Sequence, residues 1–124
     1  MPARALILFS HGSPDPEWAT PFIALQDMIA ASRPGTPVTV AFLAPAKPAF
    51  EDVVAQLAQS GVREIVVAPV FLARGGHVKR DLPELVAQAS AKYGLAIRVL
   101  PSLGEVEVLL QSMADWIAQS ALDE

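Results

Sequence analysis

The chain contains two histidines, His11 and His77, and no cysteine. Neutral imidazole can accept a proton or bind a transition metal near pH 7, so acid–base or metal chemistry could start from these two positions. The absence of cysteine excludes disulfide scaffolds, Cys-ligated zinc, iron–sulfur clusters and thiol nucleophiles. Glycines flank both histidines, at Gly12 and at Gly75 and Gly76, where a backbone without Cβ can approach a ligand closely.

Four short apolar runs must position these residues, and they cover residues 5–9, 38–43, 65–72 and 96–100. None of them alternates between polar and apolar residues, which is typical of parallel strands covered on both faces. The segments that follow carry apolar residues at spacings of three and four, as amphipathic helices do. This alternation predicts an α/β fold with a four-stranded parallel sheet and helices on both faces. By analogy with flavodoxin-like folds, we expect the strand order 2-1-3-4.

Local signals predict where the helices begin. Ser13 is expected to cap the first helix, with Pro14 at its first position. Asp81 followed by Glu84 is typical of a capping box and predicts the start of the third helix. The last helix has the clearest apolar stripe. Its members are Val106, Leu109, Leu110, Met113 and Ile117.

The expected site lies where the strands end. Ligands of open α/β sheets bind beyond the carboxyl ends of the strands, near the point where strand order reverses. His11 follows the first run and His77 follows the third, and the order 2-1-3-4 makes these strands neighbours. We therefore expect both imidazoles at one site. The alternative for each histidine is a capping or surface role.

The charges are unevenly placed along the chain. Nine Lys and Arg against thirteen Asp and Glu give a net charge of −4, which argues against a nucleic-acid partner. Lys47, Arg74, Lys79 and Arg80 nevertheless fall after the second and third runs. A basic rim on an acidic protein would suit a small polyanionic ligand, and ordinary solvated surface charge is the alternative.

The length of 124 residues predicts a single domain over residues 1–124. The apolar runs are too short to cross a bilayer, and the first residues lack the pattern of a secretory signal. We therefore expect a cytoplasmic protein without a membrane partner. The hydrophobic fraction of 52% indicates elements buried on both faces or an oligomer interface.

Four motifs resemble those of the class II sirohydrochlorin chelatases of the CbiX type. They read L-x-S-H-G-S-x-D-P after the first run, A-F-L-x-x-A-x-P after the second, V-x-P-V-F-L-x-x-G-G-H-V-K-R-D-L-P at the third and P-S-L-G-E after the fourth. The third motif is long and specific, and the resemblance spans nearly the whole chain. The length is similar to that of the short, single-domain form.

The resemblance implies a three-layer chelatase-like fold and a lyase that inserts a divalent metal into sirohydrochlorin. Cobalt would feed cobalamin synthesis, iron would give sirohaem, and nickel would lead to another tetrapyrrole. The metal is a substrate, no organic cofactor is implied, and the short form implies a homodimer. The family's catalytic and metal-binding histidines correspond to His11 and His77. Contacts expected for a flat macrocycle with many carboxylates are Ser10, Gly12, Ser13, Phe42, Leu43, Phe71, Leu72, Arg74, Gly75, Gly76, Lys79 and Arg80.

The sequence departs from the family at one position. Relatives commonly carry Glu in the second motif, where this chain has Ala44, so a carboxylate that could assist metal binding or deprotonation is missing. A competing hypothesis is therefore a divergent protein that binds a tetrapyrrole or metal without turnover. A third, phosphoryl transfer at His11, rests on a superficial similarity of Ser10-His11-Gly12 to the Arg-His-Gly of histidine phosphatases, whose Arg is absent here.

Overall fold

The computed structural model describes residues 4–73 and 75–123, and the side chains of all of these except residues 76–78. Four strands form one parallel sheet: β1 (Arg4–Ser10), β2 (Val38–Phe42), β3 (Glu64–Pro69) and β4 (Ala96–Val99). Their order is β2-β1-β3-β4, and all three pairings are parallel. The predicted fold class and strand order are confirmed.

Strand β3 ends three residues earlier than the apolar run suggested. The last pair between β1 and β3 joins Phe9 and Pro69, and Pro69 has no amide proton to extend the ladder. The amide of Val70 still donates to the carbonyl of Phe9 at 2.8 Å. Phe71 and Leu72 then leave the sheet and form a loop at its carboxyl edge.

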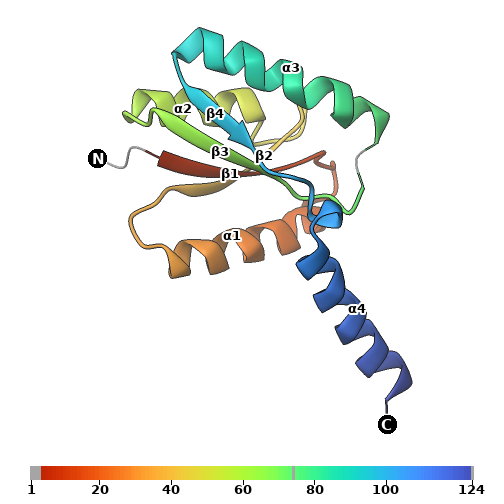
Figure 1. Cartoon of the computed structure of the whole chain (residues 1–124). Coiled ribbons are helices and arrows are strands. Elements are labelled where there is room, and N and C mark those ends of the chain that lie inside the picture. Colours follow the sequence, from red (N-terminus) through yellow and green to blue (C-terminus); the bar gives the residue numbers. More distant parts are fainter. Residues whose placement is uncertain (1–3, 74, 124) are drawn as a thin grey trace.

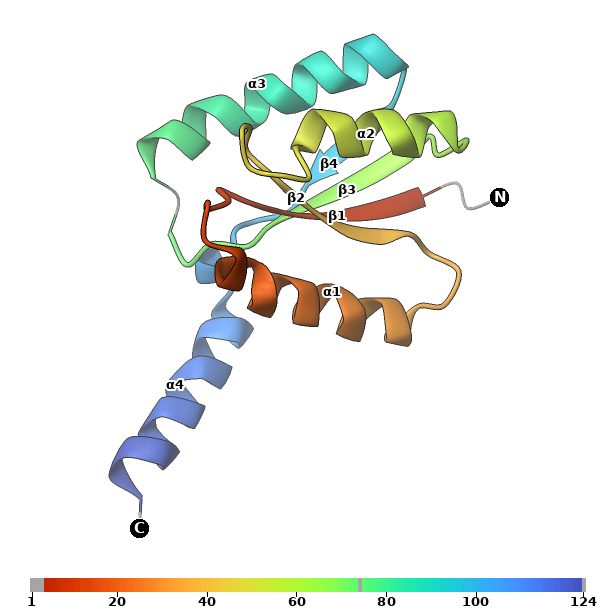
Figure 2. The same cartoon turned by 180° about the vertical axis from the view of Figure 1, so that it is seen from behind.

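Helices cover the two faces of the sheet unequally. The 3-10 helix η1 (Pro16–Ala19) and helix α1 (Thr20–Ser32) lie on one face, and α2 (Phe50–Gln59) and α3 (Gly76–Tyr93) lie on the other (Figures 1 and 2). The larger apolar core lies beneath α2 and α3, and a smaller one lies beneath η1 and α1. Members of the larger core include Ile7, Phe9, Val54, Ile65, Val67 and Leu82.

Two predicted helix starts were wrong. Asp15, rather than Ser13, caps the first helical segment, because its carboxylate accepts from the amide of Glu17 at 3.0 Å while Ser13 accepts from the amide of Asp15. Helix α3 begins at Gly76 after an extended Gly75, so Asp81 lies inside the helix and does not cap it. The shift carries His77 from a loop into the first helical turn.

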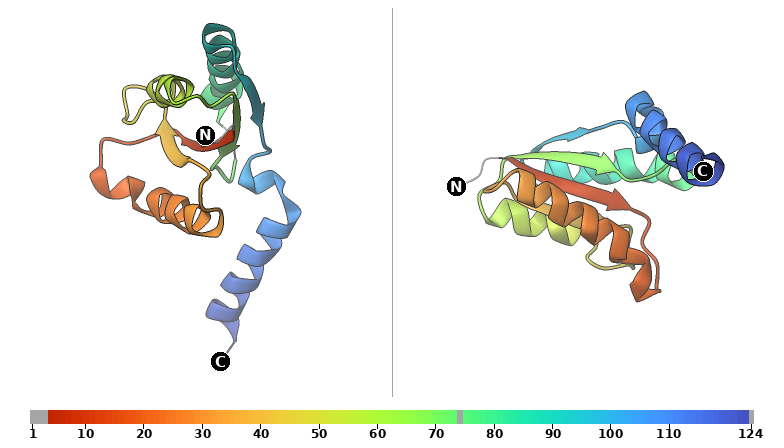
Figure 3. Two further views of the ribbon diagram at one scale, coloured as in Figure 1. Left: turned by 90° about the vertical axis from the view of Figure 1, so that its left-hand side faces the viewer. Right: turned by 90° about the horizontal axis from the view of Figure 1, so that it is seen from below.

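The last helix, α4 (Glu107–Leu122), covers neither face. Its main packing partner is the short segment η2 (Leu103–Glu105), and most of the helix extends away from the body (Figures 1 and 3). The predicted helix is therefore present, but its apolar stripe is exposed rather than buried: Leu110 is 44% exposed and Ile117 is 56% exposed. Among residues 4–73 and 75–123, no helix combines the length and apolar character that crossing a membrane requires.

Candidate functional site

Backbone hydrogen bonds tie the loops after the four strands into one framework at the carboxyl edge. The amide of Leu43 donates to the carbonyl of Ser10 at 3.2 Å, which joins the loops after β1 and β2. The amide of Gly104 donates to the carbonyl of Phe71 at 3.1 Å, which joins the loops after β3 and β4. Since β1 and β3 are hydrogen-bonded neighbours, side chains on these loops share one edge.

His11 stands at the centre of this edge. It directly follows β1 and is exposed to solvent. Its ring lies 5.1 Å from the ring of Phe71, at an interplanar angle of 74°. Phe71 in turn contacts the buried Phe9, with ring centroids 6.2 Å apart. An edge-on aromatic contact of this kind favours one orientation of the imidazole, so the core fixes the placement of a reactive side chain.

The backbone of His77 reaches the same edge. Strand β3 ends at Pro69, and α3 begins at Gly76, at the side of the sheet where β1 ends (Figure 1). The structure thus brings the two histidine-bearing segments together. The side chain of His77 lies outside the described residues, as does all of Arg74.

A first hollow of about 410 Å³ opens beside His11. It lies between the loops after β1 and β2, and its lining residues are His11, Gly12, Ser13, Pro14, Leu43, Ala44, Pro45 and Ala46. Gly12 has φ +86°, and a Cβ at this position would overlap the side chain of Ala46. Gly12 is therefore required both by its left-handed backbone and by the close approach of the two loops.

A second hollow of about 430 Å³ is lined in part by Phe71, the ring partner of His11. Its lining is almost wholly apolar and consists of Phe22, Val70, Phe71, Leu72, Leu103, Leu109, Ser112 and Met113. Gly104 lies next to one of these lining residues, since a Cβ at this position would collide with the carbonyl of Leu72. The contact between His11 and Phe71 thus connects two largely apolar hollows, and such hollows are typical of small-molecule sites.

The predicted substrate contacts fall into two groups. Leu43 and Leu72 line the hollows, and Lys79 and Arg80 are exposed, as contacts with a ligand require. Lys47, expected in the basic rim, is exposed as well. Ser10 and Phe42 are each only 3% exposed. Phe42 packs against Trp18 and Phe22 in the smaller core, so it supports the site from beneath instead of facing it.

The edge offers few anionic ligands. Ala44, where the family motif commonly has Glu, is exposed in the first hollow. Within residues 4–73 and 75–123, no three side chains of His, Cys, Asp or Glu are grouped so that they could hold a metal ion.

Sequence reasoning missed two features of the site. The ring contact between His11 and Phe71 joins residues sixty positions apart in the sequence, and no local sequence pattern predicts it. The close approach of Gly104 to Leu72 depends on how two loops cross. Gly104 lies in the motif P-S-L-G-E, and this glycine was the one signal in the sequence that could have indicated the close approach.

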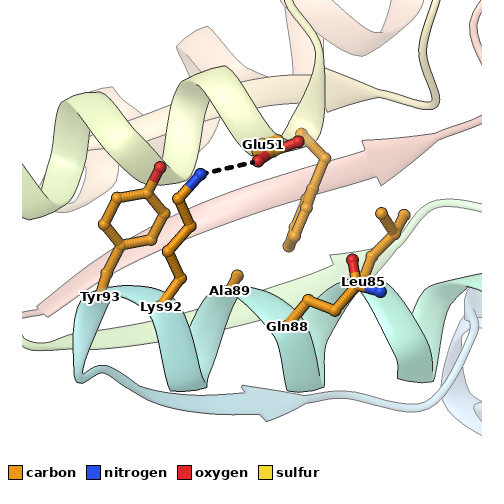
Figure 4. A pocket seen from close by; sticks show the side chains of 7 residues that line it. Glu51, Leu85, Gln88, Ala89, Lys92 and Tyr93 are labelled. Carbon is orange, nitrogen blue, oxygen red and sulfur yellow. Dashed lines mark hydrogen bonds and ion pairs between the residues drawn. The ribbon is translucent and has the colours of Figure 1, made fainter.

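A further pocket of about 100 Å³ lies between α2 and α3, away from the four loops (Figure 4). Lys92 donates to Glu51 there at 3.3 Å, and this hydrogen bond, with the neighbouring Tyr93, raises the pKa of the Lys92 ammonium. Both partners are more than 60% exposed, so the pair contributes little to stability. Because this pocket is small and lies between two helices, we interpret it as part of the packing of α2 on α3 rather than as a substrate site.

Known proteins resemble the chain in sequence and in fold. The sirohydrochlorin cobaltochelatase of Methanopyrus kandleri is 35% identical over 82 residues, which cover 66% of this chain and 57% of that protein. The chain therefore spans less than two thirds of this relative's length. A crystal structure of a CbiX protein of Marinobacter aquaeolei VT8, linked by its description to cobalamin (vitamin B12) biosynthesis, superposes with a TM-score of 0.84 at 27% identity, covering 94% of this chain and 96% of that chain.

A longer protein has the same fold. The sirohydrochlorin chelatase SirB of Bacillus subtilis subspecies spizizenii, solved in complex with cobalt, superposes with a TM-score of 0.71 at 24% identity. The match covers 94% of this chain but 50% of SirB. The sequence model of the CbiX family matches residues 5–120, which is nearly the full sequence. With the parallel sheet in the order 2-1-3-4 and His11 at its carboxyl edge, the chain belongs to the CbiX family.

Proposed function

We propose that the protein is a sirohydrochlorin chelatase that inserts a divalent metal, cobalt or iron and also nickel, into the macrocycle during cobalamin or sirohaem biosynthesis. The observation that carries this proposal is the placement of His11 in one open, largely apolar hollow and against Phe71, which lines a second, at the carboxyl edge of a CbiX-family fold. The relative from Methanopyrus kandleri, named a sirohydrochlorin cobaltochelatase, supports the same substrate.

Metal insertion has simple chemical requirements. One divalent metal enters the ring and two pyrrole N–H protons leave, so the site must hold a metal and accept protons. Neutral imidazole does either, and we assign these two tasks to His11 and His77 jointly. The hollows would hold the flat macrocycle, with Leu43 and Leu72 as apolar walls. Lys47, Lys79 and Arg80 would face its carboxylates.

The same proposal covers the setting of the reaction. Residues 1–124 act as one domain, two copies form a homodimer, and the enzyme works in the cytoplasm. The metal is a substrate, and no organic cofactor takes part. Support for the dimer comes from SirB, in which a similar fold occupies half of a longer chain.

The decisive experiment follows the absorption spectrum of sirohydrochlorin mixed with protein and cobalt, ferrous iron or nickel. We expect insertion faster than the uncatalysed reaction, and we expect His11→Ala and His77→Ala each to abolish the added rate, because each removes an imidazole from the site. Lys92→Ala is the matched control, since its side chain is exposed away from the edge; it should retain full activity. No acceleration with any of the three metals would reject the proposal.

The non-catalytic alternative is favoured by one observation, the exposed Ala44 in the first hollow. A binding protein would shift or quench the spectrum of sirohydrochlorin without inserting metal. Ala44→Glu tests how far the missing carboxylate limits turnover. We expect it to raise the insertion rate roughly tenfold, because general acid–base and ligand groups commonly contribute about 10²-fold or more when well placed. Ala44→Gln, similar in size but uncharged, should give no gain.

A further inference from the structure

The carboxyl edge has no carboxylate in the loop after β2. Residues 43–49 contain no acidic side chain, and Ala44 is exposed in the first hollow. The exposed Lys47, Lys79 and Arg80 give the edge a positive rim, which repels a divalent cation. Neutral imidazoles do not offset this charge. A carboxylate from another element of the fold would therefore favour binding of the metal substrate.

Glu105 lies at the other end of the same edge. Because the strand order is β2-β1-β3-β4, the loops after β2 and β4 flank the strands that lead to the two histidines. Glu105 is exposed and ends η2, which lies beside the loop after β3 in two opposite views (Figures 1 and 2). That loop leads into α3, whose first turn carries the backbone of His77. Glu105 thus faces the edge from the side opposite to Ala44.

The main chain around Glu105 is fixed by hydrogen bonds. The amide of Gly104 donates to the carbonyl of Phe71 at 3.1 Å, and the amide of Glu105 donates to the carbonyl of Ser102 at 2.9 Å. Ser102 is buried, with 1% exposed. The ring of Phe71 lies 5.1 Å from the ring of His11. The same contacts that place the imidazole of His11 therefore also place the backbone that carries the carboxylate.

Two other acidic residues near this edge are less suited to hold a metal. Asp15 follows His11 closely in sequence, but its carboxylate accepts from the amide of Glu17 at 3.0 Å and caps η1. Glu107 belongs to the first turn of α4, which extends away from the body (Figure 1). Glu105 combines exposure with a backbone tied to the loop that contacts His11.

We propose that Glu105 supplies the carboxylate that the second motif lacks, and that it binds the incoming divalent metal together with imidazole. Two imidazoles and one carboxylate form a known ligand set for ferrous iron. The negative charge of Glu105 offsets the basic rim, so the metal is attracted to the edge before the macrocycle takes it. The biological role rests on the proposed metal insertion, whereas binding of the metal alone can be tested without it.

Cobalt(II) binding to the full chain without macrocycle tests the ligand role by calorimetry. We expect Glu105→Gln to bind cobalt about tenfold more weakly than the wild type, since even residues that only support a metal ligand cost 10–100-fold in affinity. Glu105→Asp keeps the charge and should retain part of the affinity. Glu107→Gln is the matched control, because it removes a neighbouring exposed carboxylate; it should bind cobalt like the wild type.

Three results of this measurement would overturn the inference. They are a wild type that does not bind cobalt, equal affinities of the wild type and Glu105→Gln, and an equal loss in Glu107→Gln. Circular dichroism checks that each variant remains folded. Recovery of affinity in Glu105→Asp separates the loss of a ligand from a structural effect, and an Asp variant no better than the Gln variant would count against the ligand role.

Insertion of cobalt into sirohydrochlorin tests whether Glu105 replaces the missing Glu. In the chain with Ala44, Glu105→Gln should slow insertion about tenfold. In the Ala44→Glu background the same substitution should cost less than about twofold, because groups that share one task are not additive. Equal losses in the two backgrounds would show that the two positions serve different tasks and would overturn the replacement.

Failure of this inference can be told apart from failure of the proposed function. A wild type that binds cobalt through Glu105 but does not accelerate insertion overturns only the proposed function. A wild type that inserts cobalt no faster than Glu105→Gln overturns only the role of Glu105.

Discussion

At the scale of single residues, the aromatic contact of His11 is a defining feature of the candidate site. His11 is exposed, and the ring that orients it belongs to Phe71, which rests on the buried Phe9. The imidazole is therefore available to a ligand while its placement is set by the core. Removing the ring of Phe71 should disturb the orientation of His11 without removing any reacting group.

We expect Phe71→Leu to slow insertion roughly three- to tenfold, since an aromatic pair of this kind is worth about 0.5–1.5 kcal/mol. The chain has two histidines, so proton NMR can resolve the His11 ring, whose signals should lose the ring-current shift from Phe71. Phe22→Leu is the control. Phe22 lines the second hollow, but its ring contacts are with Trp18 and Phe42. Its replacement should therefore leave the His11 signals in place. Unchanged signals in Phe71→Leu would contradict the assigned role.

At the scale of elements, the loops after the strands act as one unit. The loops after β3 and β4 touch at Gly104, whose amide bonds to Phe71 and whose missing Cβ makes room for the carbonyl of Leu72. The position of Phe71, and through it that of His11, thus depends on a loop that follows another strand.

We expect Gly104→Ala to destabilise the fold by ~1–3 kcal/mol, the usual cost of forcing a methyl group into a filled space. Urea denaturation measures this as a lower midpoint. Gly75→Ala is the control, because a Cβ at that position meets nothing within 4 Å, and its midpoint should move little. Equal losses in the two variants would show that the close approach at Gly104 is not what matters.

At the scale of the whole molecule, helices cover the two faces of the sheet to different extents. The larger core lies beneath α2 and α3, while the smaller core beneath η1 and α1 gathers side chains of β1, of β2 and of the end of β3, where Ala68 packs against it. Helix α4 covers neither face and leaves Trp116 68% exposed. The proposed homodimer is tested at this scale: sedimentation or light scattering of the full chain should return twice the chain mass of 13.2 kDa. A mass of one chain would contradict it.

Much of the fold could be predicted from the sequence, because apolar runs and helical spacings report burial directly. The four strands and the placement of His11 after β1 followed from such patterns, while the strand order came from the analogy with flavodoxin-like folds. The start of α3 did not, because Asp81 and Glu84 are spaced like a capping box although Gly75 precedes the actual first turn. The direction of α4 could not be predicted either, since an apolar stripe is the same whether its partner is the chain's own sheet or another copy.

The close packing of the carboxyl edge also limits which positions there can accept a larger side chain. A Cβ on Gly12 would overlap the side chain of Ala46, and a Cβ on Gly104 would collide with the main-chain carbonyl of Leu72. The side chains of Ala44 and Leu72 instead line the two hollows and are exposed. We therefore expect substitutions of Ala44 and Leu72 to alter the proposed choice of metal or macrocycle while the backbone that holds His11 stays the same.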